Sequence, residues 1–469
     1  MIFRTNTNRI IFFLLILLLF LHIVLLANTK FTLWPEMIVY PYLFNNGFLL
    51  YKDIINPYPP ALTLFLSKFS TFFGYSPQSF QILTWAIIIL IDVLIFTVAA
   101  KLTKKLFFGL LSALFFIFLS IPFGINGLWF DLIQTPFILL ASYFFYQFLQ
   151  NKNLRNLYIA FLLTTFAIFI KQQAVWLMVL FLLIITFNKK INFSKDHPKI
   201  FLIFIPLIFL STVHLLVFSN LGILKDFLFW NINLPLFKTS LAPGYILLPT
   251  ARQMVVMITL FLIFLPIFFS KKSDYKFFVL TSLFLIIFSY PRFDYFHLIP
   301  SLATLSLLFG PLAEKTFKSN INSKPIVVGA SILLLSFSIR FFINDWGSPI
   351  RFFEPEIFKA ANFISKKTNR KDTLYIQNGP DQLLPLSNRL PIKPWADEFS
   401  WYLELEGIQE QIISSLINQN PKFIIYKPYD KGEKYDLGVY EPRYIAGYLD
   451  ENYENLIKIN GTLWLKIRK

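Results

Sequence analysis

The stretch FLLYKDIINPYPP, at residues 48–60, holds a carboxylate between rigid flanks. Tyr51, Lys52 and Asp53 form an aromatic–basic–acidic triplet, and two prolines end the stretch. A residue before proline is kept out of the α region, so we expect the chain to follow a fixed, non-helical path here. Such a path can aim a carboxylate and a cation at a bound ligand. The stretch is therefore the first candidate for a functional site.

The surrounding composition is that of a membrane protein. Of 469 residues, 56% are hydrophobic and 15% are charged, whereas roughly 25% are charged in a soluble globular protein. Phenylalanine occurs 58 times, and the mean hydropathy is +0.60. The absence of cysteine excludes a disulfide, a thiolate metal site and a cysteine nucleophile. The expected class is a polytopic all-α membrane protein.

About eleven apolar segments are candidates to span a bilayer. They cover residues 10–28, 80–100, 106–122, 128–149, 155–170, 172–187, 199–219, 253–270, 276–290, 297–313 and 325–343. The first is too long in its apolar core for a cleaved signal peptide. Between the first two spans lie WPEMIVYPYLFNNG and PPALTLFLSKFSTFFG, which are too short to span. We expect both to form helices that lie on the membrane surface.

Charge predicts the orientation of the spans. With the N-terminus in the cytoplasm, the cytoplasmic pieces are 1–9, 101–105, 150–157, 188–199, 271–276 and 314–324. They carry roughly twice as many Lys and Arg residues as the alternate, outer loops, as the positive-inside rule requires. The net charge of +17 is mostly this signal, so nucleic acid is not an expected partner. The protein is predicted to lie in the cell membrane with both long loops, 29–79 and 220–252, outside.

The chain changes character near Asn344, where charged and turn residues become frequent. We therefore predict a polytopic domain at 1–345 and a small extracytoplasmic α/β domain at 346–469. Its expected elements are helices at 355–368 and 407–419, strands at 373–377 and 422–426, and a hairpin at 455–467 around Asn460-Gly461.

Acidic residues of the membrane half gather near the outer surface. They are Glu36, Asp53, Asp131, Asp226, Asp294 and Asp345, with Asp92 alone deep in a span. Charged groups near hydrocarbon are costly, so they tend to face a cavity or a partner. Structural alternatives remain for several of them: Asp92 and Asp131 could hydrogen-bond neighbouring spans, Asp294 could pair with Arg292, and Asp53 could be a solvated loop acid beside Lys52. Glu36 could be a helix-terminal acid favoured by the macrodipole.

Several of these pieces, in order, resemble the GT-C membrane glycosyltransferases. Gly47, LYKDI and PYPPAL are similar to the first outer loop of the bacterial branch related to protein O-mannosyltransferases and lipid A aminoarabinose transferases. IKQQAVW at 170–176 and SYPRFDYFHLIPSLATL at 289–305 resemble later pieces of the same families, as does a small outer C-terminal domain. One position departs from the pattern, because Pro35-Glu36 stands where the family commonly has Asp-Glu.

The resemblance implies a GT-C-like fold and sugar transfer from a polyprenyl-phosphate carrier to an acceptor hydroxyl on the outer face. One carboxylate within hydrogen-bond reach suffices as the base, and either Glu36 or Asp53 could supply it. Fixed cations would stabilise the leaving phosphate. The expected donor phosphate-binding residues are Lys52, Lys171, Arg252 and Arg292, and the expected substrate-binding residues are Tyr51, Gln172, Asp294 and His297.

The acceptor implied is a glycan, lipid or protein. No cofactor is expected with certainty, and a divalent metal has no support because the four histidines are scattered. Two other functions stay open. A polysaccharide ligase or polymerase would depend on loop 220–252 and Arg252, and a lipid-linked-sugar transporter or flippase would need charges in mid-span and broken helices.

Overall fold

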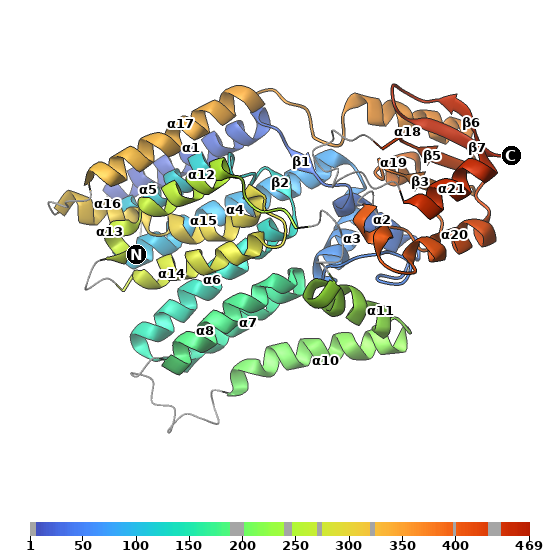
Figure 1. Cartoon of the computed structure of the whole chain (residues 1–469). Coiled ribbons are helices and arrows are strands. Elements are labelled where there is room, and N and C mark those ends of the chain that lie inside the picture. Colours follow the sequence, from blue (N-terminus) through green and yellow to red (C-terminus); the bar gives the residue numbers. More distant parts are fainter. Residues whose placement is uncertain are drawn as a thin grey trace. The chain divides into compact units, whose positions relative to one another are not determined.

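The computed structural model describes residues 6–187, 201–238, 246–269, 274–318, 324–396, 400–429 and 442–469 (Figure 1). The expected cytoplasmic piece at 188–199, and parts of those at 1–9, 271–276 and 314–324, lie outside these residues. The chain divides into two compact units. The helical unit is Met1–Phe31, Gln81–Thr212 and Leu248–Ser348, and the mixed unit is Thr32–Phe80, Val213–Leu247 and Pro349–Lys469.

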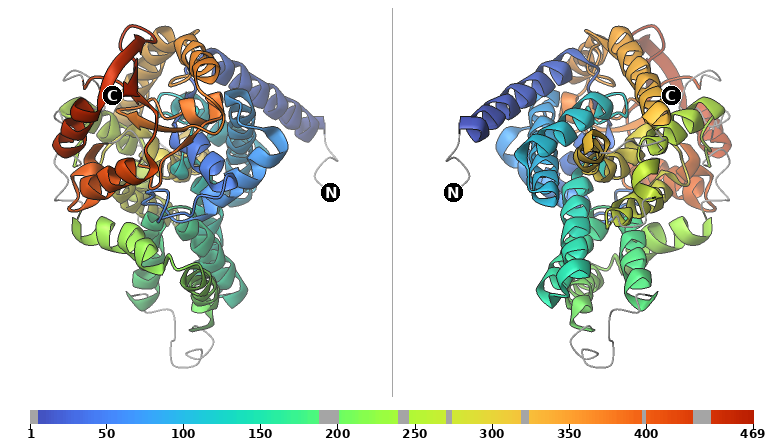
Figure 2. Two further views of the ribbon diagram at one scale, coloured as in Figure 1. Left: turned by 90° about the vertical axis from the view of Figure 1, so that its right-hand side faces the viewer. Right: turned by 90° about the vertical axis from the view of Figure 1, so that its left-hand side faces the viewer.

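Most helices of the helical unit, drawn in Figures 1 and 2, coincide with the apolar segments of the sequence. They are α1 (Asn6–Asn28), α4 (Pro77–Thr103), α5 (Leu106–Ser120), α6 (Phe130–Asn151), α7 (Leu154–Ile170), η1 (Gln172–Ala174), α8 (Val175–Phe187), η2 (Leu202–Phe204), α10 (Ile205–Asn220, which from Val213 on is counted in the mixed unit), α12 (Ala251–Leu262), α13 (Leu265–Phe268), α14 (Lys276–Leu285), η5 (Ile286–Ser289), η6 (Tyr295–Leu298), α15 (Ile299–Ser306), α16 (Phe309–Lys318) and α17 (Lys324–Asp345). Every expected apolar segment contains an α-helix. Of the described helical segments, 6 are long and apolar enough to cross a membrane.

Aromatic packing fills the centre of the helical unit. Phe145 of α6 stacks on Phe181 of α8, with 4.0 Å between ring centroids and 4° between planes. Phe277 of α14 also stacks on Phe145, with 5.6 Å between the ring centroids. Where α5 crosses α4, a Cβ on Gly109 would lie 2.5 Å from the carbonyl oxygen of Phe96. A glycine is therefore required for the two backbones to approach this closely, as is common between membrane helices.

The acid deep in a span has a partner. Asp92 of α4 and His22 of α1 are both fully buried, and Asp92 Oδ2 lies 2.6 Å from His22 Nδ1. The interpretation of Asp92 as a hydrogen-bonding group between spans is thus confirmed. Since a buried polar group is costly without a partner, the pair holds α1 to α4.

The mixed unit joins outer-loop segments with the C-terminal part of the chain. Its elements are β1 (Thr32–Leu33), α2 (Glu36–Asn45), α3 (Ala61–Phe73), α11 (Leu224–Leu228), the π-helix η3 (Phe229–Lys238), α18 (Pro355–Lys367), β3 (Thr373–Gln377), α19 (Leu383–Ser387), β4 (Leu390–Pro391), η7 (Ser400–Glu404), α20 (Ile408–Gln419), β5 (Phe423–Tyr426), α21 (Arg443–Asn452), β6 (Tyr453–Lys458) and β7 (Trp464–Arg468). A single mixed sheet has the strand order β4-β3-β5-β7-β6. The helices and strands expected in the C-terminal part are present.

The sheet is parallel on one side and antiparallel on the other. Strand β3 pairs in parallel with β4 and β5, with Tyr375 opposite Ile424. Strand β7 pairs antiparallel with β5 and β6. The turn between β6 and β7 is held by Asn460, whose Oδ1 accepts the Leu463 amide at 2.9 Å. The predicted hairpin is therefore present.

Helix α2 differs from the expected surface helix. Glu36 through Leu43 are all buried, and Pro41 lies inside the helix. A helix that is apolar on all sides is a buried helix, and EMIVYPYLF has only one charged residue. Helix α3 does have an amphipathic pattern, with Leu62 and Leu66 buried and Phe72 exposed.

Candidate active site

The loop that carries Asp53 is a tight, hydrogen-bonded turn. The Asp53 and Ile54 amides both donate to the Leu49 carbonyl, at 2.8 and 3.1 Å, and the Tyr51 amide donates to the Ile54 carbonyl at 2.9 Å. Tyr51 has a φ of 71°, which is unusual for a residue with a side chain. The rigid path predicted from the prolines is present, but backbone hydrogen bonds within the turn hold it as well.

The exit from this turn is fixed by two side chains. Asn56 is fully buried, and its Oδ1 accepts the Tyr58 amide at 2.9 Å. The Tyr51 hydroxyl donates to the Tyr58 carbonyl at 3.1 Å. Tyr51 is 1% exposed, and burial raises the pKa of its phenol. This tyrosine therefore stays neutral and stabilises the loop.

The Asp53 carboxylate has two donors on one oxygen. Oδ2 accepts the Leu49 amide at 3.0 Å and the Lys393 ammonium at 2.9 Å. The Asp53 side chain is 16% exposed and that of Lys393 is 41% exposed. A carboxylate with such donors keeps one orientation, as a positioned base or ligand-binding group must.

The other candidate base is much less accessible. Glu36 is the first residue of α2 and is 2% exposed. The macrodipole still favours its charge, because it lies in the first turn. The solvated setting expected for a surface-helix acid is absent.

Lys52 points toward solvent beside an acidic neighbour. Its side chain is exposed, unlike those of the nearby Tyr51 and Ile54, which are buried. Burial raises the pKa of Asp226 in α11, and the charge of Lys52 partly offsets that rise. An exposed cation next to the Asp53 turn is available to an anionic ligand.

In the helical unit, three polar side chains converge on Asp131. Its Oδ2 lies 2.7 Å from Lys171 Nζ and 2.8 Å from His297 Nδ1, and Lys171 lies 3.2 Å from the same histidine nitrogen. Gln134 donates to Asp131 Oδ1 at 3.1 Å. The side chains of Asp131 and Lys171 are 0% and 4% exposed. This is a compact, charge-balanced cluster.

Chain geometry explains how the cluster forms. Asp131 lies in the first turn of α6, where the helix N-terminus favours a negative charge. Lys171 interrupts the helical path between α7 and η1 with extended backbone, and so directs its side chain inward. His297 comes from η6, whose first residues are ordered by Asp294, since Asp294 Oδ1 accepts the Tyr295 amide at 2.7 Å.

The remaining predicted site residues differ in how far their side chains are exposed. Gln172 opens η1 and is half-buried. Arg252 is exposed at the start of α12, which is capped by a Thr250–Gln253 capping box. Arg292 is half-buried in the segment between η5 and η6. The predicted site residues thus divide between the two units: Glu36, Tyr51, Lys52 and Asp53 belong to the mixed unit, and Lys171, Gln172, Arg252, Arg292, Asp294 and His297 belong to the helical unit.

Two residues that contact predicted site residues, Asp131 and Lys393, were not themselves predicted as site residues. Asp131 was recognisable as an outer acid at the start of a span, but nothing in the sequence linked it to Lys171. Lys393 has no local signal, because it lies 340 residues after Asp53. Among the described residues, no cluster of three or more His, Cys, Asp or Glu side chains could hold a metal ion.

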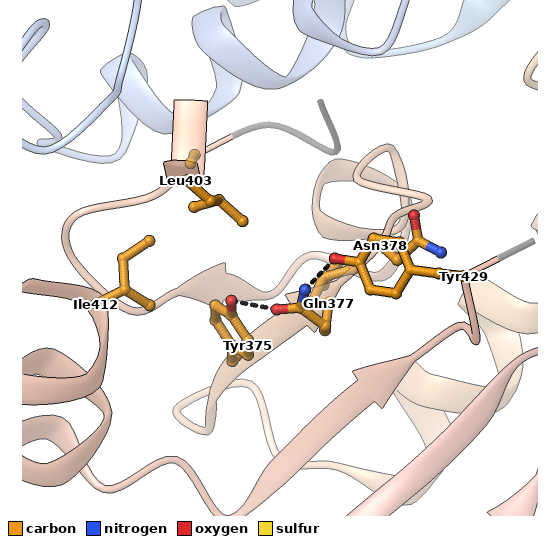
Figure 3. A pocket seen from close by; sticks show the side chains of 8 residues that line it. Tyr375, Gln377, Asn378, Leu403, Ile412 and Tyr429 are labelled. Carbon is orange, nitrogen blue, oxygen red and sulfur yellow. Dashed lines mark hydrogen bonds between the residues drawn. The ribbon is translucent and has the colours of Figure 1, made fainter. Parts of the chain in front are cut away.

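A small pocket of the mixed unit lies apart from the predicted residues. It opens at the end of β3, where the Tyr375 hydroxyl donates to Gln377 Oε1 at 2.5 Å and Gln377 Nε2 donates to Tyr429 (Figure 3). Leu403 and Ile412 line its apolar side. Gln377 is 2% exposed, so its hydrogen bonds satisfy a buried amide.

Comparison with known families points to part of the chain. Residues 57–215 match the family described as dolichyl-phosphate-mannose-protein mannosyltransferase. The matched range begins in the proline-rich end of the Asp53 loop and includes Asp131 and Lys171. A sequence comparison with curated proteins finds no match.

Solved structures resemble nearly the whole chain. ArnT from Cupriavidus metallidurans bound to undecaprenyl phosphate aligns with a TM-score of 0.60 and 12% identity, covering 98% of both chains. ArnT from the same organism in the apo state gives a TM-score of 0.53 and 12% identity, over 96% of this chain and 97% of that one. The Archaeoglobus fulgidus oligosaccharyltransferase tethered with an acceptor peptide gives 0.52 and 11%, over 95% of this chain and 72% of that one.

These findings confirm the predicted fold class and the resemblance to GT-C membrane glycosyltransferases. The chain is a mostly helical, multi-pass membrane protein with a C-terminal mixed-sheet domain and an ArnT-like fold.

Proposed function

We propose that this protein, which has the fold of the GT-C membrane glycosyltransferases, transfers a sugar from a polyprenyl-phosphate donor to an acceptor hydroxyl. The observation that carries the proposal is the likeness to ArnT bound to undecaprenyl phosphate, which extends over 98% of both chains. The match of residues 57–215 to a mannosyltransferase family that acts from a dolichyl-phosphate donor supports the same chemistry.

The reaction needs a base and a stabilised leaving group. The acceptor oxygen forms a bond to the anomeric carbon while the bond from that carbon to the phosphate oxygen breaks. The hydroxyl proton passes to a carboxylate, for which Asp53 and Glu36 are the candidates. The electron pair stays on the departing lipid phosphate. Nearby cations would stabilise the negative charge of this phosphate.

Of the proposed phosphate-binding residues, Lys52 and Arg252 have exposed side chains. An exposed cation can bind a phosphate without first breaking a buried ion pair. Lys171 differs, because its charge is already balanced by Asp131 at 2.7 Å. We therefore propose that Lys171 acts together with Asp131, while the exposed Lys52 and Arg252, together with the half-buried Arg292, supply the positive charge for the donor.

The contacts of the proposed substrate-binding residues also support different roles. Tyr51 is 1% exposed, and its hydroxyl is used within the loop, so positioning of the loop is the role that its contacts support. Gln172 is the half-buried neighbour of Lys171. Asp294 caps η6 and orders His297, which contacts Asp131. Gln172, Asp294 and His297 are proposed to face the sugar.

The proposal is tested with a panel of donors. Purified protein is incubated with polyprenyl phosphates that carry different sugars, and the release of free polyprenyl phosphate is measured in the presence of membrane extract as the acceptor source. At least one donor is expected to release phosphate carrier at a rate above that of protein-free controls. Failure of every donor, with bound donor detectable, would contradict the transferase and favour a transporter.

Orientation gives a second prediction. Lys and Arg residues favour the alternate loops, so the N-terminus is proposed to be cytoplasmic and the C-terminal domain extracytoplasmic. A reporter that is active only outside the cytoplasm should be active when fused after residue 469 and silent when fused at residue 192. The reverse pattern would place both long loops, and Asp53 with them, on the cytoplasmic side.

A further inference from the structure

A segment after β4 pairs with the backbone on both sides of Asp53. The Trp395 amide donates to the Asp53 carbonyl at 2.8 Å, and the Ile55 amide donates to the Trp395 carbonyl at 2.9 Å. Ile54 and Trp395 form a parallel β-bridge. The C-terminal part of the chain thus adds a short strand-like partner to the first outer loop. Both segments belong to the mixed unit.

Lys393, in the same segment, contacts the loop at three points. Its ammonium donates to Asp53 Oδ2 at 2.9 Å and to the Gly47 carbonyl at 3.1 Å. It also lies 4.3 Å from the centroid of the Phe48 ring, a distance at which a cation is attracted by the ring face. These contacts define one position for the ammonium above the turn.

The backbone of Lys393 is fixed from the other side. Gln419, the last residue of α20, accepts the Lys393 amide at 2.9 Å and donates to the Lys393 carbonyl at 2.6 Å. The lysine is therefore held between a helix of the C-terminal part and the outer loop. A long side chain with both ends held is not a freely moving surface lysine.

The two carboxylate oxygens of Asp53 have different surroundings. Oδ2 accepts from both Leu49 and Lys393. Within the described part of the chain, both side-chain hydrogen bonds that Asp53 accepts go to Oδ2 and none goes to Oδ1. A carboxylate whose one oxygen is fixed by two donors presents the other in a constant direction.

We propose that Lys393 is a positioning residue for the reaction: it holds Asp53 by Oδ2, so that Oδ1 faces the acceptor hydroxyl. This inference rests on the proposed function for its kinetic consequence. It assigns the C-terminal part of the chain a direct role in arranging the reacting carboxylate. Misplacing a catalytic group by about 1 Å can lower a rate by about 100-fold.

A purely structural role would give a different result. An ion pair with a partly exposed lysine adds little to stability, because solvent screens it. Lys393→Gln should therefore change turnover far more than thermal unfolding. It removes the charge and keeps a hydrogen-bonding side chain. Lys393→Arg keeps the charge and should restore part of the lost rate.

The kinetic test compares these variants with a matched control. Lys422→Gln removes a lysine whose ammonium also lies over an aromatic ring, that of Phe423 at 5.2 Å. Lys393→Gln is expected to lower kcat by about 10- to 100-fold, with the donor KM within a factor of about two and the unfolding temperature unchanged, whereas Lys422→Gln keeps the wild-type kcat. Wild-type kcat in Lys393→Gln would overturn the proposal while leaving the transferase reaction intact.

A second readout does not need activity. The Leu49 amide donates to Asp53 Oδ2, so its hydrogen exchange reports whether that carboxylate stays in place. Exchange over residues 48–55 should be faster in Lys393→Gln than in wild type and unchanged in Lys422→Gln. Equal exchange in wild type and Lys393→Gln would overturn the positioning role. If the wild type shows no sugar transfer, the proposed function fails, yet this exchange result still stands by itself.

Discussion

Replacing Asp53 by asparagine is expected to lower the rate of sugar transfer by a factor of at least about 10² while donor binding is retained. The amide keeps the shape of the side chain and can still accept the Leu49 amide and the Lys393 ammonium. It cannot take a proton from an acceptor hydroxyl. Turnover at saturating donor should therefore fall, and the donor dissociation constant should change little.

The rate of sugar transfer by Glu36→Gln should be measured in the same assay as that of Asp53→Asn. We expect both carboxylates to be required, but the structure favours Asp53 as the base, because its side chain is 16% exposed and Glu36 is 2% exposed. A buried carboxylate is better placed to orient a neighbour than to meet a hydroxyl. Near wild-type rates in both amide variants would remove the catalytic role of the loop.

The control for these substitutions is Asp345→Asn. Asp345 is also an acid beside the predicted outer face, and it pairs with a lysine, Lys30, at 3.5 Å. The substitution therefore removes a carboxylate and an ion pair without touching the Asp53 turn. Its rate should equal that of the wild type. A loss as large as that of Asp53→Asn would mean that the effect is one of charge near the membrane surface.

Most of the fold could be predicted because its signals are local. Apolar length marked segments that each contain an α-helix, 6 of which are long enough to cross a membrane among the described residues, and the alternating residues around Asn460-Gly461 marked the hairpin. The strand expected at 373–377 has the bounds of β3. Strand β4 has only two residues, too few for a periodic pattern to mark it. Helix α2 was predicted as a surface helix because it is short, although its apolar residues occupy all sides.

For the site, the sequence could predict only features formed by residues that are close together along the chain. The prolines and the triplet at 51–53 marked a fixed, non-helical path, and the structure has a turn closed by backbone hydrogen bonds there. The contact with Lys393 joins residues 340 positions apart, and the pair of Asp131 with Lys171 joins residues 40 apart. No spacing rule connects such residues, because the packing of separate elements brings them together.

The ion pair of Asp131 and Lys171 should have the largest effect on stability. Removing one partner of a buried pair costs about 3–5 kcal/mol, since the other charge is left buried without compensation. Lys171→Gln and Asp131→Asn should each lower the free energy of unfolding by this order, seen as a lower thermal unfolding temperature in detergent. Because both side chains are almost fully buried, solvent cannot replace the lost partner.

The double variant decides whether the two residues act as a unit. Asp131→Asn with Lys171→Gln replaces both charges by amides that can still hydrogen-bond, so its loss should be smaller than the sum of the single losses. Additive losses would mean that the residues contribute separately.

Arg252→Gln provides the contrast that separates stability from donor binding. Arg252 is exposed, so its removal should leave the unfolding temperature unchanged and weaken the binding of a polyprenyl-phosphate donor. If instead Lys171→Gln unfolds like the wild type and binds the donor less well, the ammonium serves the phosphate directly. Asp131 would then be the group that holds Lys171 in place for the donor.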